Sequence, residues 1–330
     1  MMSDTAFSPI ATIAAKDIRD AKRDRFVLIV TLFLALGAVV ALVSGAIALR
    51  TDAATYAAAK ETLLALGKSV DQISAPEFYP LKLMRGAIEQ IGIVGAAIAI
   101  LIGYRAAASE RGRQTLALIL TRPIRRWQFL AGKIAAGLAL LGIGLLAVLA
   151  TLAVVAHFAS GVGLSADDLP RLAVTWVAAW AYTASFFFLG FILTMTVRKT
   201  ATALLLAFAV WLTLVLVAPQ VGDTLDPDNQ VAGGVFKSLS IAKPDQVEIM
   251  KQFATYETLR DGIEQASVTK HFERFTFAVL GIKDTYTGVP LGPILIEKQG
   301  DLIWIFLTAL GLGILAISLS LNADRLTKAE

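Results

Sequence analysis

The stretch LAGKIAAGLALLGIGLLAVLATLAVVA, residues 130–156, decides the fold class of this chain. It carries one charge, at Lys133, and is otherwise almost wholly apolar. A helix that crosses a bilayer needs about 20 mostly apolar residues, because each residue adds about 1.5 Å and the hydrocarbon core is about 30 Å thick. The stretch therefore predicts a membrane-spanning helix.

Five further stretches meet the same test, so the sequence predicts six spans. The composition agrees, since 56% of residues are hydrophobic, only 17% are charged and the mean hydropathy is +0.68. A soluble domain carries about a quarter charged residues. The prediction is an all-α integral membrane protein with six transmembrane helices, at residues 26–49, 87–104, 130–156, 172–197, 201–218 and 302–321.

The basic residues predict the orientation of the spans. An even number of spans puts both termini on one side, and Arg198 and Lys199 leave only a tight hairpin between the fourth and fifth spans. Lys and Arg are denser on the side of the termini and of the loop at 105–129 than on the other side. Positive residues favour the cytoplasm. We therefore expect a multi-pass protein of the cell inner membrane with cytoplasmic N and C termini.

Two segments on the other side predict helices outside the membrane. Residues 53–66 are rich in Ala, Leu, Lys and Glu, which favour helix. Residues 219–301 are too long for a structureless loop and contain a helical apolar pattern that begins at a proline. That pattern comprises Pro244, Val247, Met250, Ala254, Leu259 and Ile263.

The region before the first span predicts an amphipathic helix. Ile10, Ile13, Ala14, Ile18 and Ala21 recur at helical spacing, with charged residues between them. Such a helix lies in the membrane interface, and an undocked extension is the alternative. The predicted division is a cytoplasmic or interfacial helix at 1–25, spans one to five at 26–218 with a cytoplasmic segment at 106–129, an extracytoplasmic helical region at 219–301, and the last span with its tail at 302–330.

Several chemistries are excluded by what the sequence lacks. There is no cysteine and there are only two histidines, so we expect no thiolate site and no metal site in this chain. Gly67-Lys68-Ser69 resembles the end of a phosphate loop, but Thr62 stands where the loop needs glycine. The basic residues lie beside the spans, which does not favour nucleic-acid binding. We expect no enzyme activity and no cofactor bound by this chain.

The segment SERGRQTLALILTRPIRRWQFLAGK, residues 109–133, is the informative one. Pro123 stops a short helix, because the residue before a proline disfavours helical geometry. Leu116, Ile119 and Leu120 form one face of that helix. Such a helix can dock into a groove of a partner protein, or it can be an elbow that touches lipid headgroups. The residues alone leave both possibilities open.

This segment resembles the cytoplasmic signature of type-2 ABC transporter permeases. Gln114 stands where that family commonly has glycine, and Lys243 stands before Pro244 where it often has asparagine. Within the family the chain looks most similar to permeases that serve nitrous oxide reductase maturation and to related exporters. The residues that match the signature are Glu110, Thr115, Leu116, Leu118, Leu120, Arg122, Pro123 and Arg126, followed by Gly132 and Lys133 at the opening of the third span.

The resemblance implies the partners and the role of this segment. A cytoplasmic ATP-binding subunit, which holds ATP and Mg, would dock on a coupling helix within residues 106–129. The permease would pair with a second copy, in contact with membrane lipid, and work as an exporter. The alternative is a scaffold that acts on an extracytoplasmic partner without moving a solute. The implied docking residues are Glu110, Arg111, Thr115, Leu116, Ile119, Leu120, Arg122, Pro123 and Arg126.

Two patterns within the spans predict packing. Gly95, Ala99 and Gly103 form a stripe of small residues that lets a second helix approach, either in the same protomer or in a partner. The fourth span is rich in aromatic residues, which either face lipid or line a path for a lipid-like substrate. These aromatic residues are Trp176, Trp180, Phe186, Phe187 and Phe188.

Overall fold

The computed structural model describes residues 9–66, 79–111, 125–160, 163–225, 235–239, 241 and 243–321. Within these ranges every regular element is a helix, and six segments are long and apolar enough to span a membrane, which confirms the predicted fold class. The six spans are Phe26–Ala65, Pro80–Ala108, Trp127–Ser160, Asp168–Thr196, Thr200–Val221 and Gln299–Leu319.

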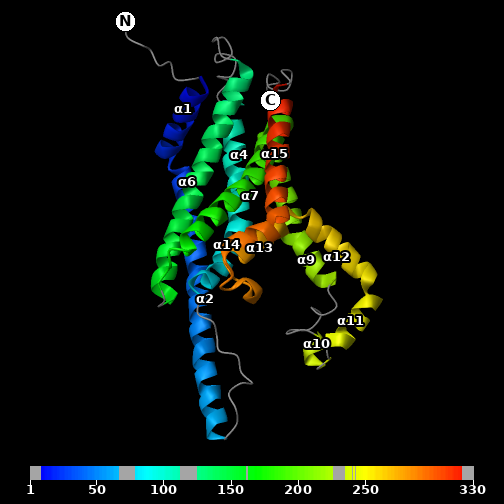
Figure 1. Ribbon diagram of the computed structural model, residues 1–330. Coiled ribbons are helices and arrows are strands. Elements are labelled where there is room, and N and C mark those ends of the chain that lie inside the picture. Colours follow the sequence, from blue (N-terminus) through cyan, green and yellow to red (C-terminus); the bar gives the residue numbers. More distant parts are fainter. Residues whose placement is uncertain are drawn as a thin grey trace.

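The spans are built from the following elements (Figure 1). The first is α2 (Phe26–Ala65), the third is α6 (Arg126–Ser160), the fourth is α7 (Asp168–Thr196) and the sixth is α15 (Gln299–Leu321). The second joins η2 (Pro80–Met84), α3 (Arg85–Gln90), η3 (Ile91–Gly95) and α4 (Ala96–Arg111), and the fifth joins α8 (Thr200–Trp211), η4 (Leu212–Val217) and α9 (Ala218–Leu225).

The remaining helices lie outside the spans. Helix α1 (Pro9–Asp24) precedes the first span. Between the fifth and sixth spans the chain forms α10 (Val235–Ser238), α11 (Lys243–Gln252), α12 (Ala254–Ala266), α13 (Val268–Val279), η6 (Asp284–Tyr286) and α14 (Leu291–Glu297). Figure 1 shows α1 and the C-terminal end of α15 at the same end of the bundle, here called the terminal face. Helices α9 to α14 lie toward the other end, here called the opposite face.

Helix α2 is longer than the predicted first span. It continues through the helix expected at 53–66, for 40 residues in all. At about 1.5 Å per residue such a helix is about twice as long as the hydrocarbon core is thick. No proline or glycine stands between Arg50 and Leu66, so nothing in the sequence interrupts the helix. The second half of α2 therefore projects from the opposite face.

The amphipathic helix predicted from Pro244 onward is two helices. Helix α11 ends at Gln252 and α12 begins at Ala254. Phe253 lies between them with φ −102° and ψ 15°, and its amide donates to the carbonyl of Met250. The apolar periodicity of the sequence does not reveal this break, because both helices keep the same repeat.

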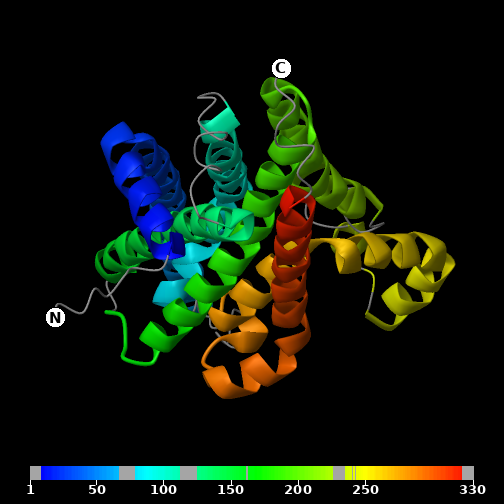
Figure 2. The same cartoon turned by 90° about the horizontal axis from the view of Figure 1, so that it is seen from above.

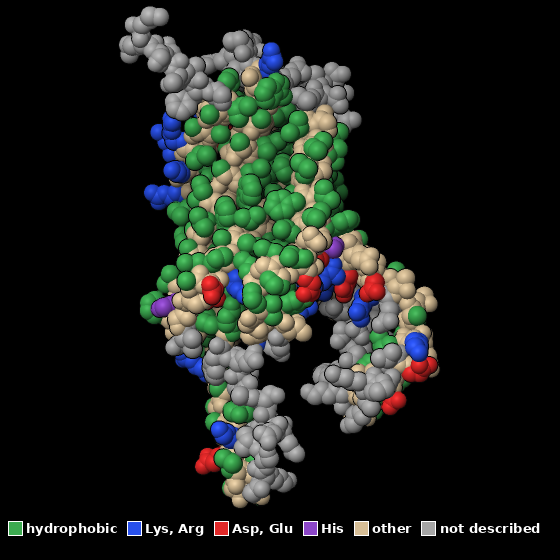
Figure 3. Space-filling view, in the orientation of Figure 1, with side chains coloured by type: hydrophobic (Ala, Val, Ile, Leu, Met, Phe, Trp, Pro, Cys, Tyr) green, Lys and Arg blue, Asp and Glu red, His purple; other side chains and the backbone are tan. Residues whose placement is uncertain are grey.

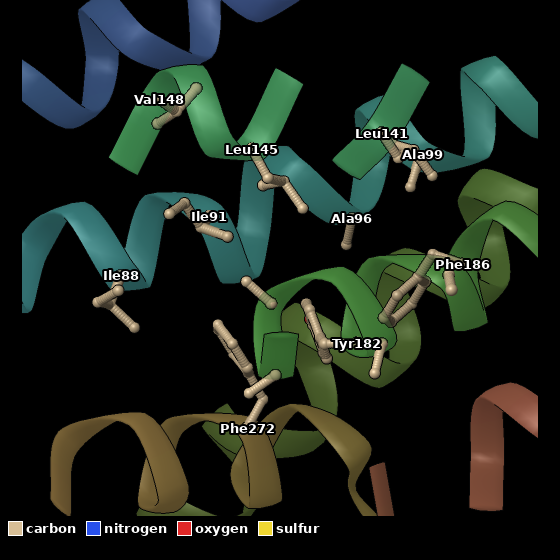
Figure 4. Packing of buried hydrophobic residues seen from close by; sticks show 14 of the residues in the cluster. Ile88, Ile91, Ala96, Ala99, Leu141, Leu145, Val148, Tyr182, Phe186 and Phe272 are labelled. Atoms are coloured by element: carbon tan, nitrogen blue, oxygen red, sulfur yellow. The ribbon is translucent and has the colours of Figure 1, made fainter. Parts of the chain in front are cut away.

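Helix α7 is the centre of the bundle (Figure 2). In the apolar window of this span 78% of residues are buried, compared with 17% in the windows of the first and fifth spans. Figure 4 shows Tyr182 and Phe186 of α7 packed among residues of α4, α6 and α13. The first and fifth spans instead present large apolar side chains outward, and Figure 3 shows the resulting apolar belt.

Helices α4 and α7 are in backbone contact. A Cβ atom built on Gly103 would lie 2.1 Å from the carbonyl oxygen of Phe187, and one on Gly190 would lie 2.4 Å from that of Ile100. Real Cβ contacts do not come so close, so both positions need glycine. The two central spans therefore form one closely packed pair.

The second and fifth spans each contain a π-helical segment, η3 and η4. Such segments leave backbone groups out of the regular helical pattern. Two carbonyls of η3 accept side-chain hydrogen bonds: Tyr182 donates to Gly92 at 2.8 Å and Trp211 donates to Ile93 at 3.2 Å. Phe272 of α13 stacks on the ring of Tyr182 with centroids 4.4 Å apart. The irregular part of the second span is thus held from α7, α8 and α13.

Candidate functional site at the terminal face

The amphipathic helix α1 packs across the beginning of α6. A Cβ atom on Gly132 would lie 2.8 Å from Cβ of Ile13 and 3.0 Å from the carbonyl oxygen of Ile10. The backbone of α1 can approach only because residue 132 has no side chain. The apolar residues of α1 therefore contact the third span, which overturns the alternative of an undocked extension.

Lys133, the next residue, forms an ion pair with α1. Its Nζ atom lies 3.1 Å from Oδ2 of Asp17, and the lysine is 3% exposed. Nζ also lies 5.3 Å from the centroid of the Phe129 ring. A buried lysine needs such partners, because an unpaired charge in an apolar environment is costly. The two residues of the Gly-Lys pair at the beginning of the third span thus have separate structural roles. Gly132 lets the backbone of α1 pack closely against α6, and Lys133 binds α1 through an ion pair.

A second ion pair fastens the end of α1 to the second span. Arg105 of α4 pairs with Asp24, the last residue of α1. Its guanidinium also lies over the ring of Phe26, 4.1 Å from the centroid. Between these partners Arg25 adopts the left-handed backbone conformation, with φ 56°. The chain turns sharply at Arg25 from α1 into the first span, and Arg105 contacts both sides of that turn.

A cavity of about 350 Å³ lies between α1 and the spans. Its lining has a charged set from α1, α4 and α6, here called the rim, and an apolar set from the first three spans, here called the floor. The rim comprises Lys16, Asp17, Asp20, Asp24, Arg105 and Lys133, and the floor includes Phe26, Val27, Ile102, Ala106, Ala136 and Leu140.

The coupling segment predicted at 106–129 connects these same elements. Glu110 and Arg111 form the end of α4, and Arg126 begins α6, but the placement of their side chains is outside the described part. The remaining predicted docking residues, Thr115, Leu116, Ile119, Leu120, Arg122 and Pro123, lie outside the described residues, so the coupling helix stays a prediction.

The small-residue stripe lies inside the protomer. Ala99 is fully buried, and Gly103 contacts the backbone of α7. A Cβ atom on Gly95 would lie 3.5 Å from a methyl of Ile91, 3.7 Å from one of Thr183 and 3.8 Å from one of Leu34. These contacts come from the first, second and fourth spans of the same chain.

The aromatic residues of α7 also face the protein. Trp176 and Trp180 donate from Nε1 to the carbonyls of Gly142 and Leu138 of α6, each at 2.9 Å. Their rings stack 6.4 Å apart. The phenylalanines at 186, 187 and 188 are buried in the core. In the described protomer these three phenylalanines therefore do not face lipid, whereas the two tryptophans are half-buried and hold α7 against α6 through their indole N–H groups.

The opposite face has a buried base of its own that the sequence did not indicate. Arg171 is 5% exposed and donates to the carbonyl of Val279 at 2.6 Å and to that of Val289. These carbonyls flank the turn between α13 and α14. No local pattern could have revealed this role, because the partners are more than 100 residues away in sequence.

Asp168 and Tyr79 complete the contacts beside Arg171. Asp168 accepts from the backbone amide and hydroxyl of Ser165 at 2.8 and 3.0 Å, and from the hydroxyl of Tyr79 at 2.9 Å. Burial and the hydrogen bond to Asp168 raise the pKa of Tyr79 to about 12. Tyr79 lies just before the second span, so this hydrogen bond ties the beginning of that span to the beginning of the fourth.

A cluster of charged groups joins α12 and α13 to the start of α15. Nδ1 of His271 lies 2.6 Å from Asp301 and 3.1 Å from Arg274, and Nε2 lies 3.0 Å from the carbonyl of Gln265. Arg274 also lies within 3.7 Å of Glu264. No group of three or more His, Asp or Glu suited to a metal ion occurs in the part of the chain that the structure describes.

Comparison with known protein families gives a match over most of the chain. The family model for the ABC-2 family transporter protein matches residues 11–321, from α1 to the last residue of α15. The chain belongs to this family. It is a membrane permease component of an ABC transporter, and the family implies a partner ATP-binding subunit that carries the ATPase. No match for the permease was found among curated proteins.

Proposed function

We propose that the permease couples ATP hydrolysis by a separate ATP-binding subunit to export of a substrate. In this proposal the terminal face is cytoplasmic, and two copies of the permease work with two ATP-binding subunits in a cell inner membrane. The observation that carries the proposal is that residues 112–124 join α4 to α6 at the point where ion pairs fasten both helices to α1.

The packing provides a route for movement from the docking segment into the bundle. A displacement of residues 112–124 would move the ends of α4 and α6 and also α1, which is paired to both. Helix α4 cannot slide freely past α7, because Gly103 and Gly190 place their backbones in contact. The second and fourth spans would then move together as one rigid body, a common form of switching in proteins.

Five of the predicted docking residues have a specific role in the proposal. Leu116 and Ile119 fill an apolar groove of the ATP-binding subunit, and Glu110 pairs with one of its basic residues. Arg122 and Arg126 hold the elbow to phosphates or to acidic partner residues. The resemblance to permeases of nitrous oxide reductase maturation is narrower than the family match and stays a prediction.

A pull-down from detergent tests the docking. The permease with Glu110→Ala and Leu116→Asp is compared with wild type for retention of the ATP-binding subunit. The matched control is Leu259→Asp on α12, a 56% exposed leucine toward the opposite face. We expect the double variant to lose the subunit and the control to retain it. If the double variant inserts normally into the membrane and still retains the ATP-binding subunit in full, the proposal is contradicted.

A scaffold function is the second candidate, because the opposite face has two projecting parts. One is the second half of α2, and the other is the arm formed by α10, α11 and α12 (Figure 1). A scaffold would use these parts to bind an extracytoplasmic partner. Tyr256 and Leu259 are exposed on α12, so their replacement by Asp tests this function. If these variants lose their function in the cell but still bind the ATP-binding subunit, the scaffold is favoured. If they keep their function in the cell, export is favoured.

A further inference from the structure

The cavity under α1 has the two-sided chemistry of an amphiphile site. We propose that it binds one aminophospholipid, with the phosphate and primary amine at the charged rim and the first part of the acyl chains on the apolar floor. This inference concerns the permease alone and does not depend on the proposed docking of the ATP-binding subunit.

The floor is formed by membrane spans. Val27, Ile102 and Leu140 come from the first, second and third spans, and Ala106 and Ala136 contribute small side chains between them. Small side chains leave space at the place where bulkier residues would close the contact. A purely water-soluble ligand would leave this apolar surface without a partner, whereas an acyl chain covers it.

The rim carries both signs of charge in equal number. Three carboxylates, of Asp17, Asp20 and Asp24, oppose three bases, of Lys16, Arg105 and Lys133. The other basic residues of α1 do not line the cavity. Figure 3 shows Lys and Arg side chains along the outer side of this part of the molecule. All three acids of α1 thus line the cavity, together with one of its four bases, Lys16.

This distribution selects a zwitterionic headgroup that has a primary amine. Arg105 and Lys16 can hold a phosphate oxygen by charge-assisted hydrogen bonds. Asp20 is exposed at the rim and can accept a hydrogen bond from an ammonium group. A quaternary amine has no N–H to donate, and a headgroup with net negative charge brings no cationic group to the carboxylate of Asp20.

Native mass spectrometry of the detergent-purified permease tests the site. The protein is incubated with an equimolar mixture of dioleoyl phosphatidylethanolamine, phosphatidylcholine and phosphatidylglycerol, and the retained lipids are counted. We expect one phosphatidylethanolamine per chain, preferred over the other two by about tenfold, as one charge-assisted hydrogen bond predicts.

Two variants and a control separate the headgroup from the floor. Asp20→Asn removes one exposed charge and should lower the preference over phosphatidylcholine by about three- to tenfold. Ala136→Phe fills the cavity and should abolish retention. Asp261→Asn, an exposed acid of α12, is the matched control and should change nothing. If Ala136→Phe does not fold, Asp20→Asn decides alone, because its position is exposed.

Three results would overturn the proposal. Equal retention of the three lipids would remove the headgroup selectivity. Unchanged phosphatidylethanolamine binding in Asp20→Asn would remove the role of the rim. Competition by soluble glycerophosphoethanolamine at the same concentration as the lipid would show that the apolar floor contributes nothing and that the site takes a headgroup alone.

Discussion

Lys133 and Arg171 are both buried bases at the ends of spans, but their partners differ in kind. Lys133, at the terminal face, pairs with the side chain of Asp17 on a separate helix. Arg171, at the opposite face, donates to the backbone carbonyls of Val279 and Val289. A side-chain ion pair can separate and form again as helices shift, whereas bonds to a backbone turn persist only while that turn keeps its shape.

The difference indicates which end of the bundle can move. At the terminal face α1 is fastened to the second and third spans by two side-chain ion pairs, and the cavity lies beside them. At the opposite face Arg171, Asp168 and Tyr79 join the second and fourth spans to the turn after α13. A movement that starts at the terminal face is therefore expected to rotate the spans about their opposite ends.

The largest expected effect is that of Arg171→Met. It leaves two buried carbonyls without their donor, which we expect to cost about 2–4 kcal/mol of unfolding free energy. Thermal unfolding in detergent measures the change, with Lys251→Met as control because that lysine is exposed and its ion-pair partner Glu248 lies in the same helix, α11. A loss no larger than that of the control would show that Arg171 does not fix the opposite face.

Lys133→Met is expected to cost less, about 1–2 kcal/mol, because the carboxylate of Asp17 that loses its partner can still be hydrated. The side chain of Asp17 is 21% exposed. The double variant with Asp17→Asn should recover part of the loss, and the double-mutant cycle measures the coupling. Strict additivity of the two changes would contradict a direct ion pair between α1 and α6.

Tyr79 provides a smaller and pH-dependent effect. Its pKa is raised by burial and by the hydrogen bond to Asp168, from 10.0 to about 12. The folded state therefore holds the phenol proton more tightly than the unfolded state. This contribution to stability is complete below about pH 10 and is lost as the pH rises toward about 12.

The measurement compares wild type with Tyr79→Phe. The difference in unfolding free energy, about 1 kcal/mol for one hydrogen bond, should be constant from about pH 8 to about pH 10 and should shrink above it. A difference that grows above pH 10 would show that the phenolate is the stabilised form and would contradict the hydrogen bond to Asp168.

The sequence predicted the spans well, because a run of apolar residues is a local signal. It did not predict how far α2 continues, since the hydropathy of the span ends near Arg50 while the helix itself meets no breaker. It did not predict the break at Phe253, because the apolar repeat continues across that residue although the helix does not.

The residues of the site could be predicted from the sequence only where they form a motif within one continuous segment. Gly132 and Lys133 stood out as a motif in the sequence. Their contacts are with Ile13 and Asp17, which belong to a helix more than 100 residues away. Lys133 is buried although it lies near the beginning of the predicted third span, and nothing in the sequence around it shows that α1 covers it. The sequence predicted that the tryptophans of α7 face lipid or substrate. It could not show their hydrogen bonds to α6, because those bonds depend on how the helices pack.

Cross-linking tests most directly the central claim that the ATP-binding subunit docks at the terminal face. The chain contains no cysteine, so a single introduced thiol has no background. Leu116→Cys and Leu259→Cys are each treated with a thiol-reactive cross-linker in membranes that contain the ATP-binding subunit. The account predicts a cross-link to that subunit from position 116 and none from position 259. A cross-link from 259 alone, or from neither position while the complex is intact, would contradict it.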